Sequence, residues 1–117
     1  MNYKETRQWG MFENLLDTSY CKVKEIKISP SQAPSYQYHH HREEFWIITQ
    51  GTGTVILDDT VSEVKVGDII HVKIGCRHRI RNTGKEDLTF IEVQLGDYFG
   101  EDDIVRLKDD YDRVSKV

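Results

Sequence analysis

The side chains best suited to chemistry lie in the stretch YQYHHHREEFWIITQG, which runs from Tyr36 to Gly51 and holds three of the five histidines. Histidine and glutamate side chains bind metal ions and transfer protons. In an extended strand alternate side chains share a face, so Gln37, His39 and His41 point to one side. Glu44 joins them if the chain turns in between. A polar row on a buried face is costly unless a partner satisfies it; the alternative is an exposed polar turn.

The elements that must position these residues are short and rich in β-branched residues, and they are separated by turn residues. This spacing is typical of an antiparallel sandwich or small barrel, and the sequence therefore predicts an all-β fold. The predicted strands cover residues 20–28, 35–40, 44–49, 53–58, 68–72, 78–82 and 88–95.

The end of the chain has a different pattern. In GEDDIVRLKDDYDRV, the apolar residues Ile104, Leu107, Tyr111 and Val114 fall at offsets of three, seven and ten. This spacing places them on one face of a helix, and the acidic residues before them suit a helix N-terminus. We expect a short C-terminal helix lying on the barrel.

Length and composition limit the function. The 117 residues suit one domain spanning 1–117, and the net charge of −4 argues against nucleic-acid binding. The sequence has no apolar run near the roughly 18 residues of a membrane span and no signal peptide, so we expect a cytoplasmic protein without membrane contact. Cys21 and Cys76 are expected to be free thiols there.

A second polar cluster lies in GDIIHVKIGCRHRIRN, and the two clusters together resemble the paired motifs of the cupin family. Glu44 and Gly51 match the first motif by their spacing. The second motif is matched by Gly67, Gly75, His78 and Asn82, with Lys73 where a proline is usual. The resemblance implies a cupin double-stranded β-helix, which is a jelly-roll barrel.

A closer resemblance covers nearly the whole chain. The segments RQWGMFENLL, YCKVKEIKISP, QYHHHREEFW and LGDYFGEDDIVRLKDDYDR are similar to the C-terminal cupin domain of type II mannose-6-phosphate isomerases. Such domains are often fused to mannose-1-phosphate guanylyltransferases, and this chain is too short to hold the second domain as well. The resemblance implies a stand-alone isomerase that interconverts mannose 6-phosphate and fructose 6-phosphate for GDP-mannose and surface-polysaccharide synthesis.

The resemblance also implies a metal site. The isomerase group has a set of glutamine, histidine, glutamate and histidine ligands, which Gln37, His39, Glu44 and His78 would supply. Zinc is the expected ion, with manganese, cobalt, iron or nickel as alternatives. The neutral glutamine leaves one negative charge on the ligands, so the ion stays strongly electrophilic.

Further roles follow from position and from the resemblance. His41 shares the strand face with the ligands and is either a further metal contact or the proton carrier. Arg42 is expected to be catalytic or to face the substrate. The phosphate of a small sugar-phosphate substrate needs cations, for which Arg77, Arg79 and Arg106 are candidates. A solvated strand face is the alternative for the first two.

Two other functions remain open. Phe45 stands where the family usually has a histidine, so a non-catalytic metal- or sugar-binding cupin is one alternative. A cupin enzyme acting on another sugar phosphate is the second. We also expect a homodimer, because an open sheet edge invites pairing.

Overall fold

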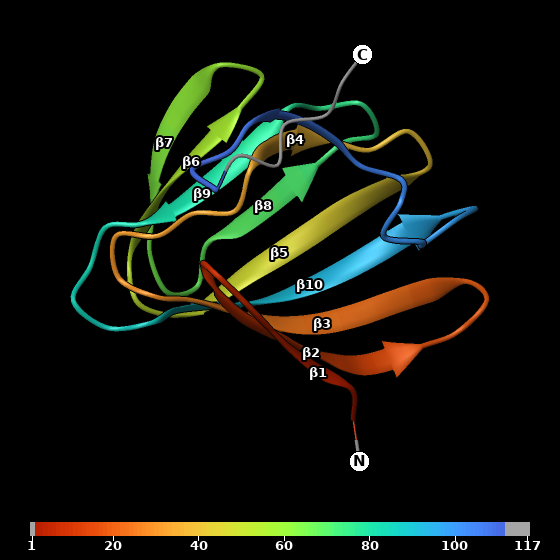
Figure 1. Ribbon diagram of the computed structural model, residues 1–117, viewed down its shortest axis with the longest axis horizontal. Coiled ribbons are helices and arrows are strands. Elements are labelled where there is room, and N and C mark those ends of the chain that lie inside the picture. The colour runs from red at the N-terminus through yellow and green to blue at the C-terminus, as the bar shows by residue number, and fades with distance from the viewer. Residues whose placement is uncertain (1, 112–117) are drawn as a thin grey trace.

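Two antiparallel sheets face each other in the computed structural model, which describes residues 2–111 (Figure 1). One sheet has six strands in the order β1-β2-β3-β10-β5-β8, and the other has five in the order β11-β4-β9-β6-β7. The strands are β1 (Lys4–Arg7), β2 (Gly10–Asp17), β3 (Cys21–Ile28), β4 (Tyr36–Tyr38), β5 (Arg42–Gln50), β6 (Gly53–Leu57), β7 (Thr60–Val64), β8 (Ile69–Val72), β9 (His78–Asn82), β10 (Leu88–Gly96) and β11 (Val105–Lys108).

The predicted all-β architecture is confirmed, and each of the seven predicted segments contains a strand. The sequence analysis missed β1, β2, β7 and β11. Four of the five residues of β7 are exposed, so this strand lacks the alternation of buried and exposed residues that reveals a strand.

The predicted C-terminal helix is wrong. Residues Val105–Lys108 form β11, which pairs with β4 along the edge of the five-stranded sheet. Backbone pairing with an open strand edge therefore outweighs a helical spacing carried by only four residues. Tyr111 packs against the core as expected, whereas Val114 lies outside the described residues.

The space between the sheets is apolar at one end and polar at the other. In β10 the side chains of Leu88 and Phe90 join the hydrophobic core, while the next inward residues are Glu92 and Gln94. The neighbouring strand β3 changes in the same way, since Lys24 lies on the same inner face as the core residues Ile26 and Ile28. Because alternate residues of a strand face the same side, these inward-facing polar residues line one polar chamber inside the barrel.

Glycine is required where strand β5 turns into β6. Gly51 has a φ of 82°, and a Cβ there would lie 2.7 Å from the carbonyl oxygen of Asp87. Only glycine combines this left-handed conformation with so close an approach. Among residues 2–111, we find no helix of the length and apolarity that crossing a membrane requires.

Candidate functional site

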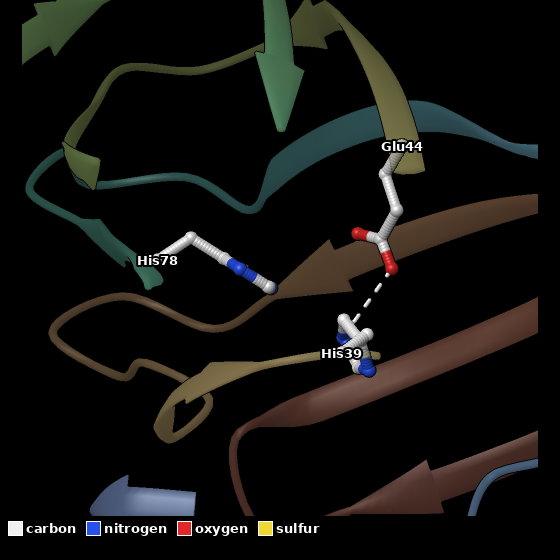
Figure 2. Close-up of side chains that lie close together, drawn as sticks. All are labelled: His39, Glu44 and His78. Carbon is white, nitrogen blue, oxygen red and sulfur yellow. Dashed lines mark ion pairs between the residues drawn. The ribbon is translucent and has the colours of Figure 1, made fainter. Parts of the chain in front are cut away.

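The polar chamber contains a cavity that holds all four predicted ligand side chains. Its lining includes Gln37, His39, Glu44 and His78. Gln37 on β4 lies opposite His78 on β9 in the strand register, so both side chains project from the five-stranded sheet. Glu44 approaches from β5 in the other sheet, and His39 follows directly after β4 (Figure 2).

Three of these residues are close enough to share one ion. One ligand atom each from His39, Glu44 and His78 lies within 4.8 Å of the others, and all three side chains are buried. Nε2 of His39 is 3.4 Å from Oε2 of Glu44, the pair joined by the dashed line in Figure 2. Two imidazoles and one carboxylate at this separation form a mixed nitrogen and oxygen donor set.

Backbone carbonyl groups fix how both imidazoles present their nitrogens. Nδ1 of His39 lies 2.5 Å from the carbonyl oxygen of Asp103, and Nδ1 of His78 lies 2.9 Å from that of Cys76. A carbonyl oxygen only accepts hydrogen bonds, so each Nδ1 carries the proton and donates it. Each Nε2 therefore keeps its lone pair, which is the arrangement typical of metal-binding histidines.

Both histidines are neutral at neutral pH. Burial, reinforced by the positive charge of Arg42, lowers the pKa of His39 to about 3. Burial also lowers the pKa of His78 to about 4, although the carbonyl of Cys76 acts in the opposite direction. Neutral imidazole is the form that binds metals, so protons compete weakly for this site above pH 5.

Arg42 contacts the same donor atoms. Its Nε donates to Oε2 of Glu44 at 2.8 Å, and its Nη2 lies 3.3 Å from Nε2 of His39. The remaining oxygen, Oε1 of Glu44, accepts the indole N–H of Trp46 at 3.0 Å. The guanidinium group thus lies against the donor atoms that a bound cation would contact. Its Nη1 is buried without a hydrogen-bond partner among residues 2–111.

These observations fit a divalent metal ion. The two lone pairs and the carboxylate converge, both imidazoles are held by carbonyl groups, and Gln37 lines the same cavity. A buried donor set of this kind is costly without a cation. Arg42 is the cation that satisfies it in the structure, so metal binding requires the guanidinium to withdraw from the shared atoms.

Two further ionisable residues of the cavity escaped the sequence analysis. Glu92 lines the cavity on β10, and burial together with the negative charge of Glu44 raises its pKa to about 8. Lys24 lines the cavity from β3, directly opposite Glu92 in the register. Strand alternation could have revealed them, because Glu92 and Lys24 each continue a row of inward-facing apolar side chains.

The structure places His41 outside the cavity, contrary to the expectation that it shares a face with Gln37 and His39. Strand β4 ends at Tyr38, so the alternation stops before His41 is reached. The side chain of His41 is 53% exposed, and its Nδ1 lies 3.4 Å from the carboxylate of Asp97. Neither role predicted for His41 is consistent with this position.

The predicted phosphate-binding arginines lie in three different places. Arg77 is exposed and does not line the cavity, so its predicted role is not supported. Arg79 lines the cavity, but its Nε donates to the carbonyl oxygen of Pro34, and its Nη2 lies 2.8 Å from a carboxylate oxygen of Asp110. Arg106 on β11 lines a smaller pocket that adjoins the cavity at Gln37.

Phe45 faces away from the cavity. It packs on the outer face of the six-stranded sheet, stacked on His71 with ring centroids 4.2 Å apart. Its neighbours along the strand, Glu44 and Trp46, point inward and line the cavity. A histidine at position 45 would therefore lie on the opposite side of the strand from the ligand atoms.

Comparison with known proteins agrees with the resemblance. The profile of the family described as "Mannose-6-phosphate isomerase C-terminal" matches residues 1–109. Xanthan biosynthesis protein XanB of Xanthomonas campestris is 41% identical over 111 residues, which are 95% of this chain and 24% of that protein. A mannose-1-phosphate guanylyltransferase of Escherichia coli is 37% identical over 108 residues, which are 92% of this chain and 23% of the enzyme.

The chain thus spans about a quarter of the length of these relatives. Among solved structures, a Klebsiella pneumoniae protein with a double-stranded β-helix domain superposes with a TM-score of 0.72 and 24% identity, covering 80% of each chain. At this identity the likeness concerns the fold alone, and it confirms the predicted double-stranded β-helix of the cupins.

Proposed function

This chain belongs to the mannose-6-phosphate isomerase C-terminal family of cupin domains, and from that premise we propose that it is a metal-dependent aldose-ketose isomerase. The proposed reaction interconverts mannose 6-phosphate and fructose 6-phosphate. The names of the relatives support a place in GDP-mannose and polysaccharide synthesis. The whole relatives are about four times longer, so their activities are proposals for this chain.

The observation that carries the proposal is the convergence of His39, Glu44 and His78 in one cavity that Gln37 also lines. These four residues would hold the divalent ion, and zinc suits a mixed nitrogen and oxygen donor set. When bound, the ion supplies Lewis-acid polarisation of the substrate oxygens.

The remaining cavity residues suit the other demands of the reaction. Aldose-ketose isomerisation moves a proton between C2 and C1, so a group that accepts and returns a proton must lie beside these carbons. Glu92 is the carboxyl group that lines the cavity apart from the predicted ligand Glu44, among residues 2–111. We assign it the proton transfer in place of His41. Arg42, whose buried Nη1 has no hydrogen-bond partner in the described part of the chain, is proposed to donate to a substrate oxygen.

The position of Phe45 does not support a lost activity. The suspicion rested on Phe45, and this side chain lies outside the cavity against His71. The residue that favoured the non-catalytic alternative therefore lies outside the cavity, while that alternative and action on another sugar phosphate stay open to test. A homodimer through an open sheet edge also stays a prediction.

The test is turnover of mannose 6-phosphate by chelator-treated protein, assayed with and without added zinc, manganese, cobalt or nickel. We expect a metal to restore activity. His39→Ala and His78→Ala should each lose bound metal and turnover together, because each removes one of three converging donors. Metal content is measured by mass spectrometry on the purified variants.

The matched control is His71→Ala, since His71 is an exposed histidine on β8 that does not line the cavity. It should keep both metal and turnover. Full metal occupancy in folded His39→Ala and His78→Ala would disprove the site assignment. Metal-loaded wild-type protein without turnover would instead point to a different sugar phosphate or to a binding function.

A further inference from the structure

A buried lysine projects into the cavity beside the candidate metal site. Lys24 is only 4% exposed and lies on the inner face of β3. Its Nζ is 4.2 Å from the centre of the Phe12 ring, and this contact with an aromatic face favours the charged form. Lysine is rarely buried this deeply without a partner, so its charge calls for an anion.

That anion is the carboxylate of Glu101. Oε1 of Glu101 lies 2.5 Å from Nζ of Lys24 and 3.9 Å from Nζ of Lys22. Burial raises the pKa of Glu101, but the charges of Lys24, Arg42 and Lys22 outweigh it and lower the pKa. The carboxylate is therefore ionised and lies in the field of three cations.

The two sides of this contact are built differently. Lys22 and Lys24 alternate on one face of strand β3, and Arg42 begins strand β5, so the cations are held by the central part of the six-stranded sheet. Glu101 belongs to the irregular segment between β10 and β11, and its side chain is 49% exposed. The cations are thus carried by paired strands, whereas the carboxylate reaches them from the surface.

Two of the arginines predicted to bind the phosphate are poorly placed to do so. Arg77 does not line the cavity, and the guanidinium of Arg79 is held by Asp110 and by the carbonyl of Pro34. Lys24 and Arg42, in contrast, line the same cavity as the candidate metal ligands. A phosphoryl group carries more charge than a carboxylate and offers three oxygens, which suits three cations better.

We propose that Lys22, Lys24 and Arg42 form the binding site for the phosphoryl group of the substrate, and that the carboxylate of Glu101 occupies this site until the phosphoryl group displaces it. The inference deepens the proposed function, on which it rests for the identity of the anion. Glu101 then acts as an internal competitor that keeps Lys24 and Lys22 paired when no sugar phosphate is bound.

Titration calorimetry of the 117-residue chain with inorganic phosphate tests the exchange, at the same metal content for every variant. Glu101→Gln should bind phosphate about fivefold more tightly than the unsubstituted protein, because a partly exposed ion pair no longer competes. The KM for mannose 6-phosphate should fall by a similar factor. Lys24→Met should weaken phosphate binding at least tenfold.

The matched control is Glu25→Gln, which removes a carboxylate 3.9 Å from Nζ of Lys27 on the same strand. It should leave phosphate affinity unchanged. If Lys24→Met does not fold, as judged by circular dichroism, Lys22→Met replaces it, with a weaker affinity expected. Equal phosphate affinity in Glu101→Gln and unsubstituted protein would overturn the exchange.

The outcomes separate this inference from the proposed function. Tighter phosphate binding by Glu101→Gln in a protein without isomerase turnover would support the anion site and contradict the reaction. Normal turnover, with phosphate affinity and KM unaffected by Glu101→Gln and Lys24→Met, would refute the anion site and leave the isomerase standing.

Discussion

At the scale of single residues, Glu92 offers a way to separate proton transfer from metal binding. Glu92→Gln keeps the size of the side chain and its polar contact with Gln94, whose Nε2 lies 3.0 Å from Oε2 of Glu92. An amide does not accept the substrate proton, so we expect kcat to fall about 100-fold or more. Metal content should stay the same, since Glu92 is not among the predicted ligands.

The measurement pairs steady-state kinetics with metal analysis on the same preparation. Glu43→Gln is the control, because Glu43 lies on the outer face of β5, where its carboxylate is 2.8 Å from Nε2 of His71. Unchanged kcat in Glu92→Gln would exclude Glu92 as the proton carrier. Loss of metal from that variant would make Glu92 part of the metal site instead.

Sequence reasoning placed the residues that lie at fixed motif positions. Gln37, His39, Glu44 and His78 do reach one cavity, because each belongs to a strand or follows one whose register is set by paired neighbours. His41 was misplaced, since alternation holds only inside a strand and β4 ends at Tyr38. The sequence marks strand alternation but not where it stops.

At the scale of elements, the segment between β10 and β11 positions a candidate ligand. The carboxylate of Asp103 accepts hydrogen bonds from the backbone N–H groups of His40 and His41 at 3.0 and 2.9 Å. Its own carbonyl oxygen accepts the Nδ1 proton of His39. Asp103→Ala should therefore weaken metal binding about 10-fold or more, in the range found when the partners of metal ligands are removed.

Asp102→Ala is the control for this prediction. Asp102 is the adjacent exposed residue, and its carboxylate accepts the hydroxyl of Tyr98 rather than contacting the histidine stretch. Metal affinity is measured by competition with a chromogenic chelator for both variants. Equal affinities would show that the segment does not orient His39.

The same segment shows why some strands could not be predicted from the sequence. Strands bounded by glycine, asparagine and aspartate were identified because both their ends are marked. Val105–Lys108 was assigned to a helix, since its partner β4 is distant in sequence and no local signal announces the pairing. The helical pattern assigns Glu101 and Asp103 to a helix N-terminus. In the structure Glu101 pairs with Lys24, and the carbonyl oxygen of Asp103 accepts a hydrogen bond from His39.

At the scale of the whole molecule, the barrel should gain stability from the ion. A ligand that binds only the folded state stabilises it by about 2.7 kcal/mol at a concentration 100 times its Kd. For a domain of this size such a gain raises Tm by roughly 10 °C. Chelator-treated protein should therefore unfold at a lower temperature than protein with added zinc.

Calorimetry of unsubstituted protein and His78→Ala provides the check. The variant removes one donor from the buried set, so zinc should raise its Tm much less. An equal rise in both proteins would mean that the ion binds elsewhere. The comparison needs no substrate and stays informative whatever the protein catalyses.

The carbonyl groups that orient His39 and His78 belong to the main chain, at Asp103 and Cys76. Every residue type carries that carbonyl, so no single substitution can delete either acceptor. In a saturation-mutagenesis library, Cys76 should therefore tolerate other side chains that pack against the core as it does, since each keeps the carbonyl. Genetic variation at such a position would conceal, rather than reveal, its part in the site.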